Sequence, residues 1–190
     1  MVKIGFIVEG VTEKIILDSE AFRSFLKNHQ INFVANIIDA AGNGNLLPKN
    51  IGPFISRLTD QGATVIFVLT DLDEDQCITR TKQRLEIPLH HFAIISVKEI
   101  ESWFLADSEA MSRFLESPDF FFENPESLDN PLAEIERLRL EKTGRGLKYK
   151  KVLANQLVHK SNFSIERAAN HPNCRSAKYF LTKLLEVAKP

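Results

Sequence analysis

The chain has 190 residues, of which 44% are hydrophobic and 26% are charged, and its formal net charge is −1. These proportions are typical of a globular protein with a sizeable core and exclude a disordered polyelectrolyte. The near-zero total charge excludes a general attraction to nucleic acid, so binding of that kind needs a local concentration of cations.

The N-terminus and the cysteines bear on the location of the protein. The segment from Met1 enters an expected strand directly and lacks the cleavage pattern of a secretory signal. Cys77 and Cys174 lie far apart and form neither a metal-type pair nor a disulfide framework. No apolar stretch approaches the ~20 residues that span a bilayer. We therefore expect a cytoplasmic protein without membrane association, and the oligomeric state stays open.

The first strand and helix are predicted at the N-terminus. The apolar run Val2–Val8 favours a strand and ends in Glu9 and Gly10, where glycine permits a tight turn or a positive φ. Thr12 is suited to cap a helix, and apolar residues over 13–28 follow helical spacing. Glu9 is thus expected at the carboxyl end of the first strand.

The alternation of elements continues along the chain. Strands are expected over 31–39, 65–69 and 91–97, with helices over 48–61 and 77–85 between them. This order predicts an α/β fold with a mainly parallel four-stranded central sheet flanked by helices. Later helical patterns lie over 132–141, 149–159 and 177–187. We expect residues 1–110 to form the α/β domain and 111–190 a mainly helical C-terminal extension packed on it.

Carboxylates follow the central strand. The run Val65–Leu69 suits a strand covered on both faces, and Asp71 and Asp73 come directly after it. In an extended backbone these two aspartates point to the same side, with Cα atoms roughly 6–7 Å apart. Oxygens so placed can bind one hard divalent cation or two neighbouring ones. The alternative is a solvated acidic turn before a helix that begins near Gln76.

Three further glutamates belong to the same edge of the predicted sheet. If the first helix begins directly after Gly10, Glu13 faces the site. The alternative is that Glu13 only interacts favourably with the positive N-terminal end of that helix. Glu99 and Glu101 follow the fourth strand, and alternation places them on one side of the backbone. A favourable charge at a helix N-terminus is again the alternative.

A cationic segment precedes the C-terminal helices. Seven basic residues lie between positions 137 and 151 against one acid, Glu141: Arg137, Arg139, Lys142, Arg145, Lys148, Lys150 and Lys151. Gly144 and Gly146 let the backbone approach a phosphate, and Tyr149 offers a stacking face. Lys98, after the fourth strand, can also neutralise a phosphate or pair with a neighbouring acid. The alternative for the segment is a solvated helix end.

Glu9-Gly10 after the first strand and Asp71-Leu72-Asp73 after a later one resemble the TOPRIM domain of topoisomerases, bacterial primases and overcoming-lysogenisation-defect nucleases. The segments Val8–Glu13 and Lys98–Phe104 and the basic segment near the C-terminus also resemble small TOPRIM-like proteins. One departure is that Glu74-Asp75-Gln76, rather than a nearby glycine, follows the Asp-x-Asp pair.

The resemblance implies a magnesium (or manganese) ion held by Asp71 and Asp73 near Glu9, and the positions of Glu13 and Glu101 make these two residues candidates for further ligands. Glu9 would be a general acid or base or a further ligand, and Glu99 a second catalytic residue. Lys98, Arg145, Lys148 and Lys150 would contact phosphates. The function implied is a nuclease-like enzyme that cleaves or transfers phosphodiesters of nucleic acid.

Two other functions are compatible with the same residues. The first is a metal-binding regulatory or partner-binding module without turnover, for example one that acts with an ATPase, since related nucleases often carry or accompany one. The second is a phospho-acceptor domain like bacterial receivers, with Asp71 as acceptor and Lys98 after the next strand. That function expects an acidic pair after the first strand, where Glu9-Gly10 supplies one acid.

Overall fold

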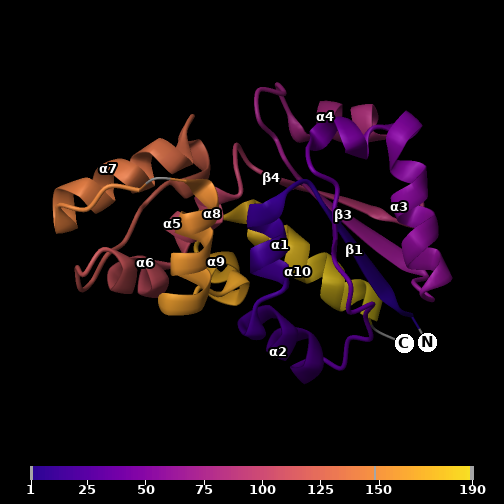
Figure 1. The fold of residues 1–190 in the computed structure, drawn as a ribbon, viewed down its shortest axis with the longest axis horizontal. Helices are drawn as coiled ribbons and strands as arrows, with labels where there is room; N and C mark the ends of the chain where they lie inside the picture. The colour runs from indigo at the N-terminus through magenta and orange to yellow at the C-terminus, as the bar shows by residue number, and fades with distance from the viewer. Residues whose placement is uncertain (1, 148, 189–190) are drawn as a thin grey trace.

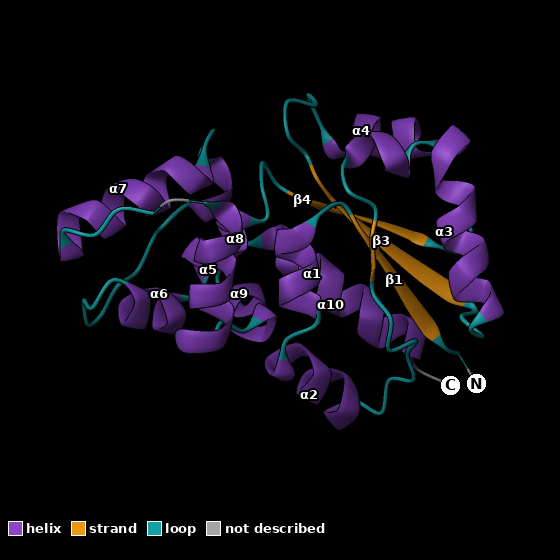
Figure 2. Cartoon of the chain, in the orientation of Figure 1, coloured by secondary structure: helices purple, strands orange, loops and turns teal. Residues whose placement is uncertain are grey.

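The computed structural model of the chain describes residues 2–147 and 149–188. Its centre is a four-stranded, all-parallel sheet in the order β2-β1-β3-β4 (Figures 1 and 2). The strands are β1 (Ile4–Val8), β2 (Ile38–Asp39), β3 (Val65–Asp71) and β4 (Phe92–Ser96). The α/β fold predicted from the alternating apolar patterns is confirmed.

Helices make up most of the remaining described chain. In the first half these are α1 (Val11–Leu17), α2 (Glu20–Asn28), the 3₁₀ turn η1 (Asn43–Leu46), α3 (Pro48–Asp60), α4 (Ile78–Leu85) and α5 (Glu101–Ala106). The second half contains α6 (Ser108–Phe114), the 3₁₀ turn η2 (Pro125–Ser127), α7 (Pro131–Thr143), α8 (Lys150–Asn155), the π-helical turn η3 (Gln156–Lys160), α9 (Ile165–Asn170) and α10 (Arg175–Ala188). Among the described helices, none combines the length and the apolar character that crossing a membrane requires.

Both faces of the sheet are covered, as the unbroken apolar run of β3 predicts. Ile66 and Val68 belong to the core on the face that α3 and α4 cover, whereas Phe67 and Leu69 belong to the core on the opposite face, beneath α1, α2 and α10 (Figure 1). Gly5 of β1 allows α3 to come close, because a Cβ there would lie 3.0 Å from Leu58 Cδ1.

Phe180 of α10 lies at the centre of the larger core. Its ring centroid is 6.4 Å from that of Phe6, 5.8 Å from Phe22, 6.1 Å from Phe67 and 5.9 Å from Trp103. Trp103 is fully buried in this core, and its indole N–H donates to Ser176 Oγ at 2.7 Å. The last helix therefore packs on the sheet itself, and α6 runs through the expected boundary at residue 110.

Some local expectations were wrong for identifiable reasons. The helix expected over 13–28 breaks where Ser19 caps α2 by accepting from Phe22 N at 3.2 Å. The strand expected over 31–39 keeps two paired residues and one isolated bridge from Phe33 to Ile4. Gly10 is extended, with φ −154°, so this turn needs no left-handed residue.

Candidate metal centre at the carboxyl edge of the sheet

Parallel pairing brings the carboxyl ends of β1, β3 and β4 to one edge. Val8 of β1 pairs with Leu69, and Asp71, the last residue of β3, pairs with Ser96. Glu9 N donates to Leu69 O at 2.9 Å, so the first residue after β1 stays attached to β3. The side chain of Glu9 is thereby directed towards the end of the neighbouring strand.

Hydrogen bonds fix the carboxylates of Glu9 and Asp71 at this edge of the sheet. Glu9 Oε2 accepts from the hydroxyl of Thr70 and from Asp71 N, the latter at 3.2 Å. Asp71 Oδ1 in turn accepts from the hydroxyl of Ser96. Asp71 is 7% exposed, so this acid is both fixed and largely removed from water.

These two acids form part of a pocket of about 390 Å³ at the sheet edge. Glu13 reaches it from the first turn of α1, and Glu101 from the first turn of α5. The carboxylates that line the pocket are Glu9, Glu13, Asp39, Asp71 and Glu101, and the ammonium group of Lys150 lies among them. Residues that are far apart in the sequence thus share one concave site.

Burial and mutual repulsion make this cluster unfavourable when fully ionised. Burial, and then the charges of Glu9 and Glu101, raise the pKa of Glu13 from 4.5 to about 7. Burial also raises the pKa of Asp71, and the charge of Glu13 adds to the effect. Burial raises the pKa of Glu101 although Lys150 opposes the shift. Such a concentration of desolvated carboxylates favours either protons or a bound cation.

Among the described residues, Lys150 at the start of α8 places a positive charge beside these carboxylates. Its Nζ lies 3.2 Å from Glu99 Oε1 and 3.4 Å from Glu101 Oε2. Burial lowers the pKa of Lys150, but Glu101, Glu99 and Asp71 outweigh burial and raise it overall. The other oxygens of the pair, Glu99 Oε2 and Glu101 Oε1, are buried and have no hydrogen-bond partner in the described part of the chain.

The residues fit a hard divalent ion by their chemistry. Unpartnered, buried carboxylate oxygens are costly unless a cation satisfies them, and oxygen ligands are those that magnesium and manganese prefer. Within residues 2–147 and 149–188, no group of three His, Cys, Asp or Glu side chains is already arranged to hold an ion. Oxygens of Glu9, Asp71, Glu99 and Glu101 are instead engaged by the hydroxyls of Thr70 and Ser96 and by the ammonium of Lys150.

Asp73 lies apart from this pocket. β3 ends at Asp71, and Asp73 has a left-handed backbone with φ +49°, so strand alternation does not extend to it. Its Oδ2 accepts from Asn43 Nδ2 at 3.2 Å, and it borders a separate hollow together with Glu74 and Asp75. The expectation that Asp71 and Asp73 project together from an extended backbone was wrong; a metal-binding role for Asp73 stays a prediction.

The predicted phosphate-binding cations are distributed over the surface. Lys98 Nζ pairs with Asp129 Oδ1 at 2.9 Å, and Arg145 pairs with Glu116 at 2.7 Å. Lys148 lies outside the described residues. Of the three predicted cations that the structure describes, Lys150 is the one that lines the carboxylate pocket.

Thr70, Ser96 and Asp39 were missed by sequence reasoning. Thr70 and Ser96 hold the carboxylates of Glu9 and Asp71, and Asp39 closes the β2 side of the pocket. Each stands at or next to the carboxyl end of a strand, which is the one signal in the sequence that could have identified them.

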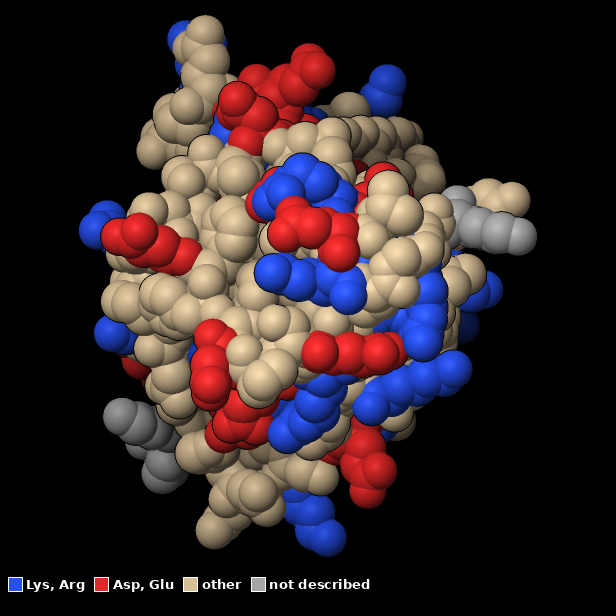
Figure 3. Space-filling model, turned by 90° about the vertical axis from the view of Figure 1, so that its left-hand side faces the viewer, with Lys and Arg blue, Asp and Glu red and all other residues tan. Residues whose placement is uncertain are grey.

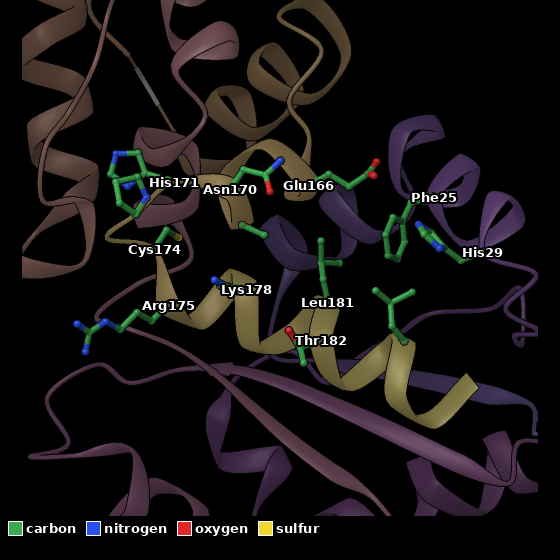
Figure 4. Close-up of a pocket in the computed structure, with 13 residues that line it drawn as sticks. Phe25, His29, Glu166, Asn170, His171, Cys174, Arg175, Lys178, Leu181 and Thr182 are labelled. Carbon is green, nitrogen blue, oxygen red and sulfur yellow. The ribbon is translucent and has the colours of Figure 1, made fainter. Parts of the chain in front are cut away.

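A different hollow, of about 380 Å³, lies between α2, α9 and α10 (Figure 4). His29, beside Phe25, and His171 lie at opposite ends of it in this view. Cys174, also on its wall, is fully buried, and burial raises the pKa of its thiol. A thiol that resists ionisation is a poor nucleophile and a poor metal ligand. This hollow does not share the chemistry of the carboxylate pocket.

The fold and the pocket define an α/β protein that carries a carboxylate cluster at the edge of a parallel sheet. The chain belongs to the family described as a domain of unknown function (DUF4276), whose model matches residues 8–185. No curated protein and no solved structure matches the chain. The match is to this family and not to a TOPRIM family, so the resemblance to TOPRIM domains stays a prediction.

Proposed function

We propose that the protein is a magnesium- or manganese-dependent nuclease, or phosphodiester-transfer enzyme, of TOPRIM type that acts on nucleic acid. The observation that carries the proposal is the pocket in which Glu9, Glu13, Asp71 and Glu101 meet at the carboxyl edge of the sheet. Three of these acids have raised pKa values, as expected where carboxylates are gathered for chemistry rather than for stability.

In this proposal Asp71, Glu13 and Glu101 hold the ion, whereas Asp73 borders a separate hollow and would join them only after a change in its backbone. A bound divalent ion would neutralise charge at a phosphoryl centre and activate an oxygen nucleophile. Glu9 lies beside Asp71 through its bond to Asp71 N and is placed to accept or return a proton. Glu99, bound to Lys150 at 3.2 Å, is the second candidate for proton transfer.

Recognition of the substrate would depend on cations at the rim of the pocket. Lys150 reaches the carboxylates from α8, and its ammonium can turn towards a phosphate once a metal binds Glu101. Tyr149, which precedes it, is 71% exposed and offers a face on which a base can stack. An acidic, metal-binding centre bordered by a cation and an aromatic ring suits a nucleic-acid strand.

A non-catalytic metal-binding or partner-binding module, acting for example with an ATPase, is the second candidate. The observation that favours it is that Lys150 already pairs with Glu99 and Glu101, while the described carboxylates are not arranged around an ion. Such a module would keep the metal affinity of the pocket without turnover.

The test compares three variants with the parent protein on single- and double-stranded DNA and RNA, with magnesium, manganese or EDTA. Asp71→Asn removes a charge and nearly preserves shape, so we expect weaker manganese binding and a loss of cleavage. Glu9→Gln should retain much of the metal affinity and lose turnover by a factor of about 100 or more. Glu123→Gln is the control, because Glu123 is exposed and has no ion pair among the described residues.

The outcomes separate the two candidates. Metal-dependent cleavage that both site variants lose and Glu123→Gln keeps supports the enzyme. Metal binding that depends on Asp71, without cleavage of any of these substrates by the parent protein, assigns the pocket to the regulatory module. Metal affinity that is unchanged in Asp71→Asn contradicts both.

A further inference from the structure

A second polar hollow, of about 420 Å³, lies between α6, α7 and η3. Four of its lining side chains are cations and one is an acid: Arg113, Arg139, Arg145, Lys160 and Glu116. We call it the arginine pocket. Figure 3 views the molecule from the side on which α6 and α7 lie in Figure 1, and on this face Lys and Arg side chains lie interspersed with Asp and Glu side chains.

The positive charge of Arg139 has little compensation. Its Nη1 donates to the carbonyl of Phe114, and its guanidinium carbon lies 4.1 Å from the centroid of the Phe114 ring. Its Nε–H is enclosed and has no acceptor in the described part of the chain, and no carboxylate there forms an ion pair with Arg139. Burial, followed by the like charge of Arg145, lowers the pKa of this guanidinium.

The other cations are only weakly engaged. Lys160 is exposed and forms no ion pair with any residue that the structure describes. Arg145 pairs with Glu116 at 2.7 Å and Arg113 with Glu109 at 3.1 Å, but all four side chains are at least 48% exposed. Exposed pairs of this kind contribute at most about 1 kcal/mol and exchange readily for a stronger anion. The pocket therefore has an excess of positive charge that an anion would neutralise.

The chemistry of the lining residues selects the anion. Guanidinium groups present parallel N–H donors that match two oxygens of a phosphate, and several of them around one hollow favour a group with two or more negative oxygens. We propose that the arginine pocket binds a phosphate group of a nucleic-acid strand, at a position away from the carboxylate pocket. This inference rests on the proposed function, because it takes nucleic acid as the substrate.

The connection between the two pockets favours a strand over a free phosphate compound. Arg145 lines the arginine pocket, and Lys150, five positions later, lines the carboxylate pocket. Five residues reach at most about 18 Å even when fully extended. A strand of a few nucleotides can therefore place one phosphate at Lys150 and another at the arginine pocket, and the exposed ring of Tyr149 lies on the segment between them.

The experiment measures binding of a fluorescent single-stranded oligonucleotide in EDTA, so that cleavage plays no part. The test variant is the double substitution Arg145→Gln and Lys160→Gln, since both side chains are exposed and their loss leaves the fold intact. Its control is the double substitution Arg137→Gln and Lys142→Gln. That control removes the same charge from α7, where Arg137 pairs with Glu134 and Glu141 outside the pocket.

We expect affinity to fall by about tenfold or more in the test variant, since a charged hydrogen bond contributes roughly 1.5–3 kcal/mol. The slope of log affinity against log salt should fall in magnitude by up to about 0.7, because the pocket holds one phosphate and each lost phosphate contact on a single strand removes roughly 0.7. The control should change affinity by less than about twofold, as expected for cations that make no direct contact with the strand. Arg139→Gln, checked for folding by circular dichroism, should reproduce the loss seen in the test variant.

Pyrophosphate is the second probe and distinguishes the source of the phosphate. If pyrophosphate displaces the oligonucleotide from the parent protein but not from the test variant, the result supports the proposal. Pyrophosphate binding that requires Arg145 and Lys160, together with unchanged oligonucleotide affinity, overturns the assignment to a strand. Equal losses of oligonucleotide affinity in the test and control variants overturn the assignment of the arginine pocket as a phosphate-binding site. Because metal is absent, a protein that never cleaves can still show the expected loss, which separates this inference from the catalytic one.

Discussion

Replacing Glu13 with Gln should stabilise the metal-free protein at alkaline pH and have little effect at acidic pH. Burial and the charges of Glu9 and Glu101 raise the pKa of Glu13 from 4.5 to about 7 in the folded state. A carboxyl group with a raised pKa binds its proton more tightly in the folded than in the unfolded chain. Stability is therefore lost as the pH rises from about 4.5 to about 7, and the loss is complete above that range.

The size of the effect follows from the shift. A pKa difference of one between the folded and the unfolded chain corresponds to roughly 1.4 kcal/mol, so ionised Glu13 destabilises the folded state by about 3 kcal/mol at pH 8. For a chain of this length that is a difference of roughly 6–12 °C in melting temperature. Glu13→Gln removes this cost and also part of the repulsion on Asp71, because the charge of Glu13 raises the pKa of that acid.

The assay is thermal denaturation in EDTA at pH 5 and pH 8 for the parent, Glu13→Gln and the exposed control Glu123→Gln. We expect the melting temperature of Glu13→Gln to exceed that of the parent at pH 8 and to approach it at pH 5, while the control follows the parent. A difference between the parent and Glu13→Gln that is the same at both pH values would refute the reasoning.

Two other substitutions examine the pocket and the core. Lys150→Gln leaves the buried oxygens of Glu101 without their cation, so the metal-free protein should lose roughly 1–3 kcal/mol at pH 8, and millimolar magnesium should restore much of the loss in a thermal melt. Phe180→Ala should cost about 3–5 kcal/mol in urea unfolding, with Trp103 fluorescence and far-UV circular dichroism changing together. If the Trp103 fluorescence of Phe180→Ala changed at the same urea concentration as in the parent protein, the result would contradict a core shared by α10 and the sheet.

The sheet was predictable because its strands and helices follow simple apolar periods. β3 is buried on both faces and therefore reads as an unbroken apolar run, and the expected helix over 48–61 matches α3 within a residue. The strand predicted over 31–39 was too long, because the apolar residues of this segment pack on the core while most of the segment forms no strand pairing. The apolar pattern does not distinguish a buried strand from a buried segment outside the sheet.

The site could be predicted in part. Glu9, Glu13, Asp71 and Glu101 were identified from their positions at the ends of strands or starts of helices, and the structure brings all four to one pocket. The direction of Asp73 depends on its left-handed backbone, which no apolar pattern reveals. The pairing of Lys150 with Glu99 and Glu101 is a tertiary contact between segments about 50 positions apart, and spacing alone contains no signal for it.

The position of α10 on the sheet has a consequence for the order in which the molecule is made. The four strands leave the ribosome before α10, but the aromatic cluster on one of their faces includes Phe180 of α10. Until then the face beneath α10 is uncovered, and α8, which contributes Lys150 to the carboxylate pocket, is itself synthesised after all four strands. A nascent chain therefore cannot complete the carboxylate pocket before α8 has been synthesised.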